Sequence, residues 1–467
     1  MVIAKQTQLP ARQLYQTTSS QNLLCLDVLR CIAIIGVVGV HLIADLEISP
    51  VRFYPSSAGI TSNLSALLTF SADSYSLQTA IIQLFQLGLK FGWQAVHVFL
   101  FISGFGLYLA FLKTSQPSSE LGLQFWLRWL RRRFDRVLPK YWVVLTAIFV
   151  IKAGSAVIDA LAGQEALSRP AILFTQYLMS LFLIRGLSQA SFFALAGALW
   201  YIPLIIGLYL CFPILIYLLR RYQISLLALL LGTVLLSLNY RFIINIDPCA
   251  TPVPFDVHAA CQNPWDWNLH RLFSIHVPYG IFLARLPEFV LGMWFAQLQA
   301  DGTLAQFLSC WQVRLKILLA GIVCWGLGNI ASYYKASWPL CDCLLCLGLV
   351  AILLALFYGC EHSPVRHLEW IIKALSKVSY EIFLIHQVVF FLLARVFLAD
   401  ALGYANFSVL YLFVMLFAAG LLNYSCRSLT INSIPFASSL YAWTERRGVR
   451  LLKRYLNYRQ SRIPSGV

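Results

Sequence analysis

The first feature of this 467-residue chain that could do chemistry is a histidine that follows an arginine by eleven residues. Eleven residues make almost three helical turns, so Arg30 and His41 would share one helix face, about 16 Å apart along the axis. An imidazole, with an unperturbed pKa of about 6.5, can accept and return a proton at neutral pH. A guanidinium can pair with two phosphate oxygens. The spacing therefore joins a candidate proton-transfer group to a candidate anion-binding group.

Positive charge is densest between residues 128 and 140. Six basic residues lie there, at the start of an apolar stretch: Arg128, Arg131, Arg132, Arg133, Arg136 and Lys140. Arginines gathered in this way form a surface that can bind phosphate groups. Attraction to anionic lipid headgroups, about 1 kcal/mol for each basic residue near the surface, is the alternative explanation. The sequence alone leaves both open.

Small residues interrupt a second apolar stretch. Gly104 and Gly106 allow backbones or a ligand to approach closely, and Ser103 offers a hydroxyl in apolar surroundings. No base is evident near Ser103 in the sequence to activate it as a nucleophile. Packing of small residues alone is the alternative.

The composition indicates that these residues belong to a membrane protein. Hydrophobic residues make up 60% of the chain and charged residues 12%, whereas soluble domains have roughly 45 to 50% and 25%. The apolar residues form blocks of about 20, long enough to cross a hydrocarbon layer of roughly 30 Å. A net charge of +16 would suggest nucleic acid in a soluble protein. Here it bears on membrane orientation, and we expect no nucleic-acid partner.

Hydropathy predicts an all-α integral membrane fold of about ten transmembrane helices. They lie near residues 24–44, 93–112, 137–158, 195–219, 223–241, 277–299, 314–331, 339–359, 376–398 and 405–427. A further apolar stretch, 171–187, is interpreted as a re-entrant or interfacial helix, because a span there would move Arg220 and Arg221 to the outer side.

The distribution of Lys and Arg predicts the orientation. With a cytoplasmic N-terminus, most basic residues fall on the cytoplasmic side, so both termini are expected there, in a multi-pass protein of the plasma (inner) membrane. A transmembrane domain, 23–427, then lies between a cytoplasmic segment, 1–22, and a basic cytoplasmic tail, 428–467. Arg30 would lie near the cytoplasm and His41 deep toward the outer half, where ionisable groups tend to face a cavity or partner. A surface anchor and an interfacial histidine are their respective alternatives.

Most of the twelve cysteines are expected to pack as small hydrophobic residues. Cys341, Cys343 and Cys346 lie close together, but no histidine flanks them and the segment is apolar, so no metal site is predicted. Cys249 and Cys261 lie in a polar outer loop, where a disulfide is left open.

These motifs, in this order, resemble acyltransferase family 3, a family of integral membrane O-acyltransferases, over nearly the whole chain. Five landmarks carry the resemblance: Arg30 with His41, Ser103-Gly104-Phe105, Arg133 with Arg136, Arg285-Leu286-Pro287-Glu288-Phe289, and Ser379-Tyr380 with His386. Two departures stand beside them. His97 occupies a position where many relatives have an aspartate, and residues 199–207 lack the family's glutamates, which puts an acceptor-side role there in doubt.

The resemblance implies transfer of an acyl group, most simply acetyl, from cytoplasmic acyl-CoA to a hydroxyl of a carbohydrate or lipid-linked glycan at the outer side. It implies that Arg133 and Arg136, together with Arg30, bind the donor's phosphates, and that Ser103 lines the acyl tunnel. His41 is expected to be catalytic, either as a general base or through a transient acyl-imidazole. Glu288 is expected to orient or stabilise that imidazole, a salt bridge with Arg285 being its alternative.

Other functions fit part of the sequence. A transporter or flippase for a lipid-linked glycan would also use intramembrane ionisable groups, but its expected internal repeat with broken helices is not evident. A sensor or scaffold that has lost catalysis fits the missing glutamates, but does not explain why Arg30, His41 and Glu288 persist. Membrane lipid is an expected partner, and a homodimer is left open.

Overall fold

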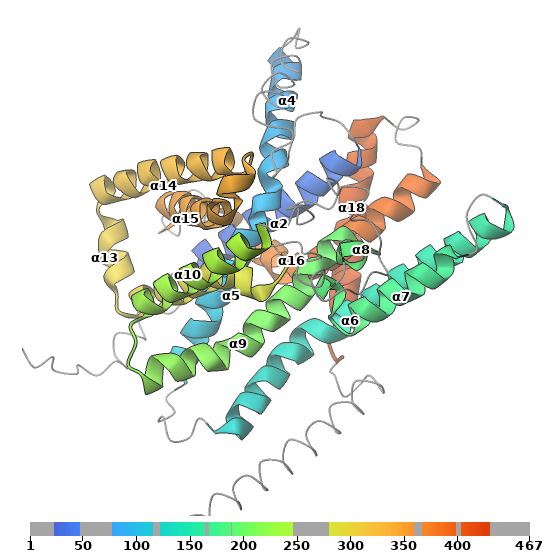
Figure 1. Cartoon of the computed structure of the whole chain (residues 1–467). Helices are drawn as coiled ribbons and strands as arrows, with labels where there is room; N and C mark the ends of the chain where they lie inside the picture. The colour runs from blue at the N-terminus through green and yellow to red at the C-terminus, as the bar shows by residue number, and fades with distance from the viewer. Residues whose placement is uncertain are drawn as a thin grey trace, which may run out of the picture.

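We describe the fold from a computed structural model of the chain. The structure describes residues 23–46, 77–114, 122–163, 168–187, 189–245, 280–358, 367–397 and 403–429, and every regular element in these ranges is a helix (Figure 1). The prediction of an all-α fold is confirmed.

The helices are given in chain order, with η for a 3-10 turn. They are α2 Leu23–Asp45, α4 Leu77–Lys90, η1 Phe91–Gln94, α5 Ala95–Leu112, α6 Leu123–Leu161, α7 Arg169–Leu181, η3 Arg185–Leu187, α8 Gln189–Phe192, η4 Gly197–Trp200, α9 Tyr201–Arg221, α10 Leu226–Asn245, η7 Phe282–Arg285, α12 Leu286–Ala300, α13 Thr303–Ser309, α14 Trp311–Ala331, η8 Lys335–Ser337, α15 Trp338–Phe357, α16 Glu369–Val396 and α18 Tyr404–Ser425.

Nine helical segments within the described ranges are long and apolar enough to cross a membrane. The sixth predicted span, 277–299, has no helix of that length. Its helix, α12, has 15 residues and begins at Leu286. Pro287 lies in its first turn, where a missing N–H costs nothing, and the four residues before the helix form a 3-10 turn.

The third predicted helix begins earlier than expected. It was placed at 137–158 because charges precede it, yet α6 runs without a break from Leu123 through Pro139 to Leu161. The basic residues therefore lie on the helix itself. α7 packs against the second half of α6 (Figure 1). With 13 residues it is only about 20 Å long, too short to span, as expected for the stretch 171–187.

Backbone contact fixes the crossing of α5 and α12. A Cβ atom added at Gly104 would overlap the carbonyl oxygen of Phe289, and one at Gly292 would overlap that of Phe101. The expectation that Gly104 admits a close backbone is confirmed. Nothing outside the helix lies within 4 Å of a Cβ at Gly106. The close crossing holds the start of α12, and with it Glu288, against α5.

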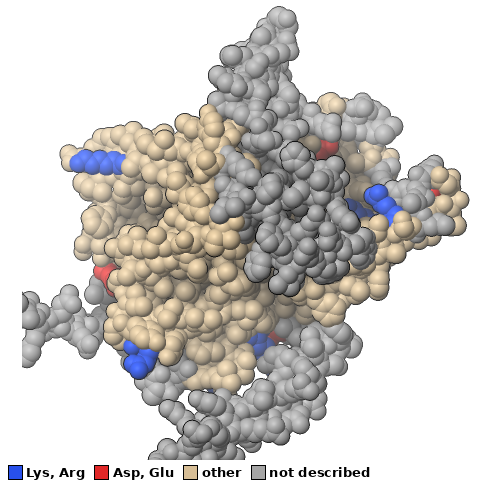
Figure 2. Space-filling model, in the orientation of Figure 1, with Lys and Arg blue, Asp and Glu red and all other residues tan. Residues whose placement is uncertain are grey.

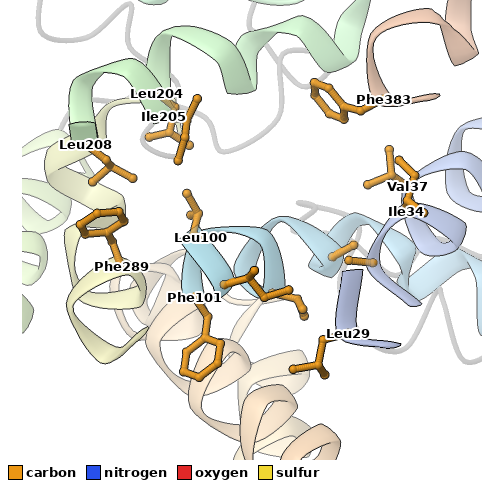
Figure 3. Close-up of a cluster of buried hydrophobic side chains, with 14 of the residues drawn as sticks. Leu29, Ile34, Val37, Leu100, Phe101, Leu204, Ile205, Leu208, Phe289 and Phe383 are labelled. Atoms are coloured by element: carbon orange, nitrogen blue, oxygen red, sulfur yellow. The ribbon is translucent and has the colours of Figure 1, made fainter. Parts of the chain in front are cut away.

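The interior is lined by apolar side chains from several helices (Figure 3). The labelled residues come from α2, α5, α9, α12 and α16: Leu29, Ile34, Val37, Leu100, Phe101, Leu204, Ile205, Leu208, Phe289 and Phe383. The outer surface is also apolar. The face in Figure 2 carries very few charges, and those visible lie toward its edges. Exposed residues of α10, α14 and α18, such as Leu235, Val323 and Phe413, are therefore suited to contact lipid.

Candidate active site

His41 lies where α2 packs against α16. Its Nδ1 atom is 3.2 Å from Nε2 of Gln387, and its ring centroid is 5.1 Å from that of His386. The backbone N–H of Ala198, in η4, donates to Oε1 of Gln387 at 2.8 Å. Segments far apart in the sequence, α2, η4 and α16, thus meet around one imidazole.

His386 is almost completely buried, with 1% of its surface exposed. Its Nδ1 atom is 2.8 Å from the carbonyl oxygen of Phe383, one turn earlier in α16. Its Nε2 atom is buried and has no hydrogen-bond partner within the described part of the chain. A buried polar atom without a partner is unfavourable, so this nitrogen is a candidate for contact with a ligand.

A cleft of about 440 Å³ opens beside Gln387, at the C-terminal ends of α2 and α16. Its wall combines charged and aromatic side chains: Asp45, Lys152, Phe193, Phe390 and Phe391. Asp45 and Lys152 interact electrostatically, and the Lys152 Nζ atom lies 5.3 Å from the centre of the Phe391 ring. The volume suits a small molecule or one end of a larger one.

The predicted phosphate-binding arginines come together at the other end of the molecule. Arg30, Arg133 and Arg136 all interact electrostatically with Tyr209 of α9. The guanidinium of Arg133 also lies 5.3 Å from the centre of the Trp129 ring. The structure therefore brings three positive charges from α2 and α6 around one side chain.

These arginines differ in their acidic partners. Arg30 is 2.9 Å from Asp27, which also accepts a hydrogen bond of 2.6 Å from the Ser376 hydroxyl. Among the residues described, neither Arg133 nor Arg136 forms an ion pair with an acid, and the two repel each other electrostatically. Neighbouring cations that lack a local counterion form a favourable site for an anion.

Lys140 is not part of this site. It forms an ion pair with Glu381 of α16, and its Nζ atom lies 3.3 Å from the Asn423 side chain of α18. The basic cluster in the sequence therefore divides into residues that tie helices together and residues that are available to a ligand.

A line of side chains joins the arginines to the histidines. Tyr209 interacts with Tyr201, whose hydroxyl lies beside Ser103. The Tyr201 ring centroid is 5.4 Å from that of Phe383, which in turn is 6.1 Å from that of His386. Ser103 donates its own hydrogen bond to the carbonyl of Phe99, four residues earlier in α5. It therefore lies between the arginines and the histidines.

Glu288 does not lie beside His41. Its Oε1 atom is 2.9 Å from Arg285 and 3.4 Å from Nδ1 of His97, and its partners among the described residues do not include His41. The expected contact between Glu288 and His41 is thus not formed. The alternative, a salt bridge with Arg285, is present, and Gln387 and His386 occupy the position beside His41 that Glu288 was expected to fill.

Asp342 completes the buried group around Glu288. It is 2.5 Å from Arg241, 3.2 Å from Arg285 and 3.6 Å from Nε2 of His97. Two arginines and two carboxylates therefore balance one another inside the membrane domain. His97 is a buried histidine whose Nδ1 atom faces Glu288 and whose Nε2 atom faces Asp342.

The chain was compared with protein families, with curated proteins and with solved structures. The model of acyltransferase family 3, described as an acyltransferase domain, matches residues 23–424. The chain belongs to this family. No curated protein and no solved structure matches it significantly. Family membership implies an acyltransferase, which takes an acyl donor and an acceptor substrate. The nine long apolar helices in the part of the chain that the structure describes indicate a multi-pass membrane protein.

The sequence analysis of this acyltransferase did not single out Asp342. Asp342 lies between Cys341 and Cys343 in α15. An acidic residue in a helix of mean hydropathy 2.7 is itself a sign of a buried polar partner or a functional site.

Cys341 and Cys346 are buried in helix packing. Within the described residues no group of three His, Cys, Asp or Glu side chains is placed to hold a metal. Cys249 and Cys261 lie outside those residues.

Replacing Glu288 with glutamine is expected to destabilise the acyltransferase by about 1 to 3 kcal/mol, because the buried Arg285 loses a charged hydrogen-bond acceptor. Thermal denaturation of the purified protein measures the effect. Glu369→Gln is the matched control, since Glu369 pairs with Lys373 in a more exposed position and should contribute about 0.5 kcal/mol or less. A Glu288→Gln protein of unchanged stability that transfers no acyl group would instead assign Glu288 to the reaction.

Proposed function

We propose that this acyltransferase moves an acyl group, acetyl being the expected one, from cytoplasmic acyl-CoA to a hydroxyl of a carbohydrate or lipid-linked glycan at the outer side of the plasma (inner) membrane. One observation carries the proposal. Arg133 and Arg136, which have no acidic partner within the described ranges, lie at one end of the fold. A histidine beside a cleft lies at the other end, and a line of neighbouring side chains joins the two.

The arginine end is the proposed donor site. Arg133 and Arg136 would bind the phosphates of the nucleotide, and Arg30, already neutralised in part by Asp27, would add a third contact. The positive-inside rule favours a cytoplasmic position for this end, where acyl-CoA is found. The pantetheine arm would follow Tyr209, Tyr201 and Ser103 toward the histidines.

The cleft is the proposed acceptor site. Phe193, Phe390 and Phe391 offer aromatic faces to the apolar side of a sugar ring, while Asp45 and Lys152 offer charged partners for its hydroxyls. His41 is the proposed catalytic histidine, because Gln387 both lines the cleft and holds the imidazole. The acceptor oxygen would attack the thioester carbon, an imidazole would take its proton, and an ester and CoA thiol would leave.

Mass spectrometry of surface glycans from cells with and without the gene tests this function. We expect the glycans of the deletion strain to keep their sugar composition and to lose an alkali-labile acyl group. Loss of the glycan itself from the surface would favour a transporter or flippase instead. Identical glycans in both strains would remove carbohydrate as the acceptor.

A further inference from the structure

We propose that His386 is a second catalytic residue, the one that takes the proton from the acceptor hydroxyl, while His41 donates a hydrogen bond from its Nε2–H to the reacting carbonyl oxygen. The inference rests on the proposed acyl transfer to a hydroxyl. It depends on which nitrogen of each imidazole carries the proton, and hydrogen-bond partners decide that for both rings.

Gln387 fixes the proton of His41. Its Oε1 atom accepts a hydrogen bond from the backbone N–H of Ala198, a group that can only donate, so the amide oxygen must point toward η4. The other end of the amide, Nε2, then donates to Nδ1 of His41 across 3.2 Å. A neutral imidazole that accepts at Nδ1 carries its proton on Nε2. His41 thus offers a donor, and its one lone pair is already engaged.

A carbonyl oxygen fixes the proton of His386. The carbonyl of Phe383 can only accept, so Nδ1 of His386 must donate to it at 2.8 Å. The neutral ring then has its lone pair on Nε2, the buried atom that has no partner within the described residues. Of the two imidazoles, His386 is therefore the one with a free proton acceptor, and its ring centroid lies 5.1 Å from that of His41.

The reaction follows from these two nitrogens. The acceptor oxygen bonds to the thioester carbon while its proton moves to Nε2 of His386. Negative charge develops on the carbonyl oxygen, and the Nε2–H of His41 stabilises it. The carbon–sulfur bond then breaks as the carbonyl forms again, and the departing thiolate takes the proton back from His386. The products are the ester and CoA thiol, and both imidazoles are again neutral.

Two near-isosteric variants test the assignment. His386→Asn keeps an N–H for the Phe383 carbonyl but has no basic nitrogen. Gln387→Glu keeps an acceptor for Ala198 but presents a carboxylate to His41, which draws the proton to Nδ1 and leaves Nε2 as a lone pair. We expect kcat to fall by about 10² to 10⁴-fold in His386→Asn and by about 10² to 10³-fold in Gln387→Glu. KM for acetyl-CoA should change little in either.

The measurement uses inside-out membrane vesicles of the native host that contain equal amounts of inserted protein. It follows the transfer of label from radioactive acetyl-CoA to glycan, counted as the label that alkali releases from the glycan. Gln306→Glu, the same change at an exposed position of α13, is the control and should match the wild type. Unchanged kcat in His386→Asn would overturn the proposal. Retained or increased activity in Gln387→Glu would do so as well, since it would make His41 the base. Failure of the wild-type vesicles to transfer any label would instead contradict the proposed function.

Discussion

Replacing His41 with alanine is expected to slow acyl transfer by at least about 10²-fold while the protein remains folded in the membrane. The reason is the position of the imidazole beside the cleft that Gln387 lines. The side chain is half-buried, and its hydrogen bond to Gln387 and ring contact with His386 belong to the site itself. Label transfer from acetyl-CoA in vesicles gives the rate, and immunoblotting gives the amount inserted.

A second histidine provides the control for this experiment. His367 is exposed two residues before α16 begins, so His367→Ala makes the same chemical change away from the cleft and should transfer at the wild-type rate. Transfer by the His41→Ala protein within a few-fold of the wild type would remove His41 from the mechanism. Equal losses in both variants would indicate damage to the membrane domain rather than to the reaction.

The helices and the grouping of the arginines could be predicted because their signals are local. Arg30 and His41 are separated by whole turns of one helix, and Arg133 and Arg136 lie one turn apart in α6. Hydropathy located the apolar helices for a similar reason. It placed the start of α6 too late, near residue 137, because charged residues precede the apolar stretch, although arginine is a good helix former.

The partners of His41 could not be predicted because they are distant in the sequence. Gln387 follows His41 by 346 residues, and Ala198 is 189 residues from Gln387. Glu288 was expected to contact His41, but the motif that contains Glu288 does not say which helices are neighbours. The crossing of α5 and α12 through Gly104 and Gly292 places Glu288 beside His97 instead.

The substitutions Arg133→Ala and Arg136→Ala together are expected to weaken acetyl-CoA binding by about 10²-fold or more, because each removes a charge-assisted contact of about 1.5 to 3 kcal/mol. Titration calorimetry of the purified protein in lipid nanodiscs measures the dissociation constant. The loss of fold stability should be small, since neither arginine has an acidic partner among the described residues.

Two comparisons separate a phosphate site from an attachment to anionic lipid. Arg220→Ala with Arg221→Ala removes the same charge from the end of α9, and should leave binding nearly unchanged. Acetyl-pantetheine, which carries the thioester without the nucleotide phosphates, should be used equally well by the wild type and the Arg133/Arg136 variant. If the two arginine pairs weaken acetyl-CoA binding to the same extent, or if acetyl-pantetheine suffers as much as acetyl-CoA, the arginines act on the membrane or the fold. A loss confined to one pair and to the phosphorylated donor would assign Arg133 and Arg136 to the phosphates.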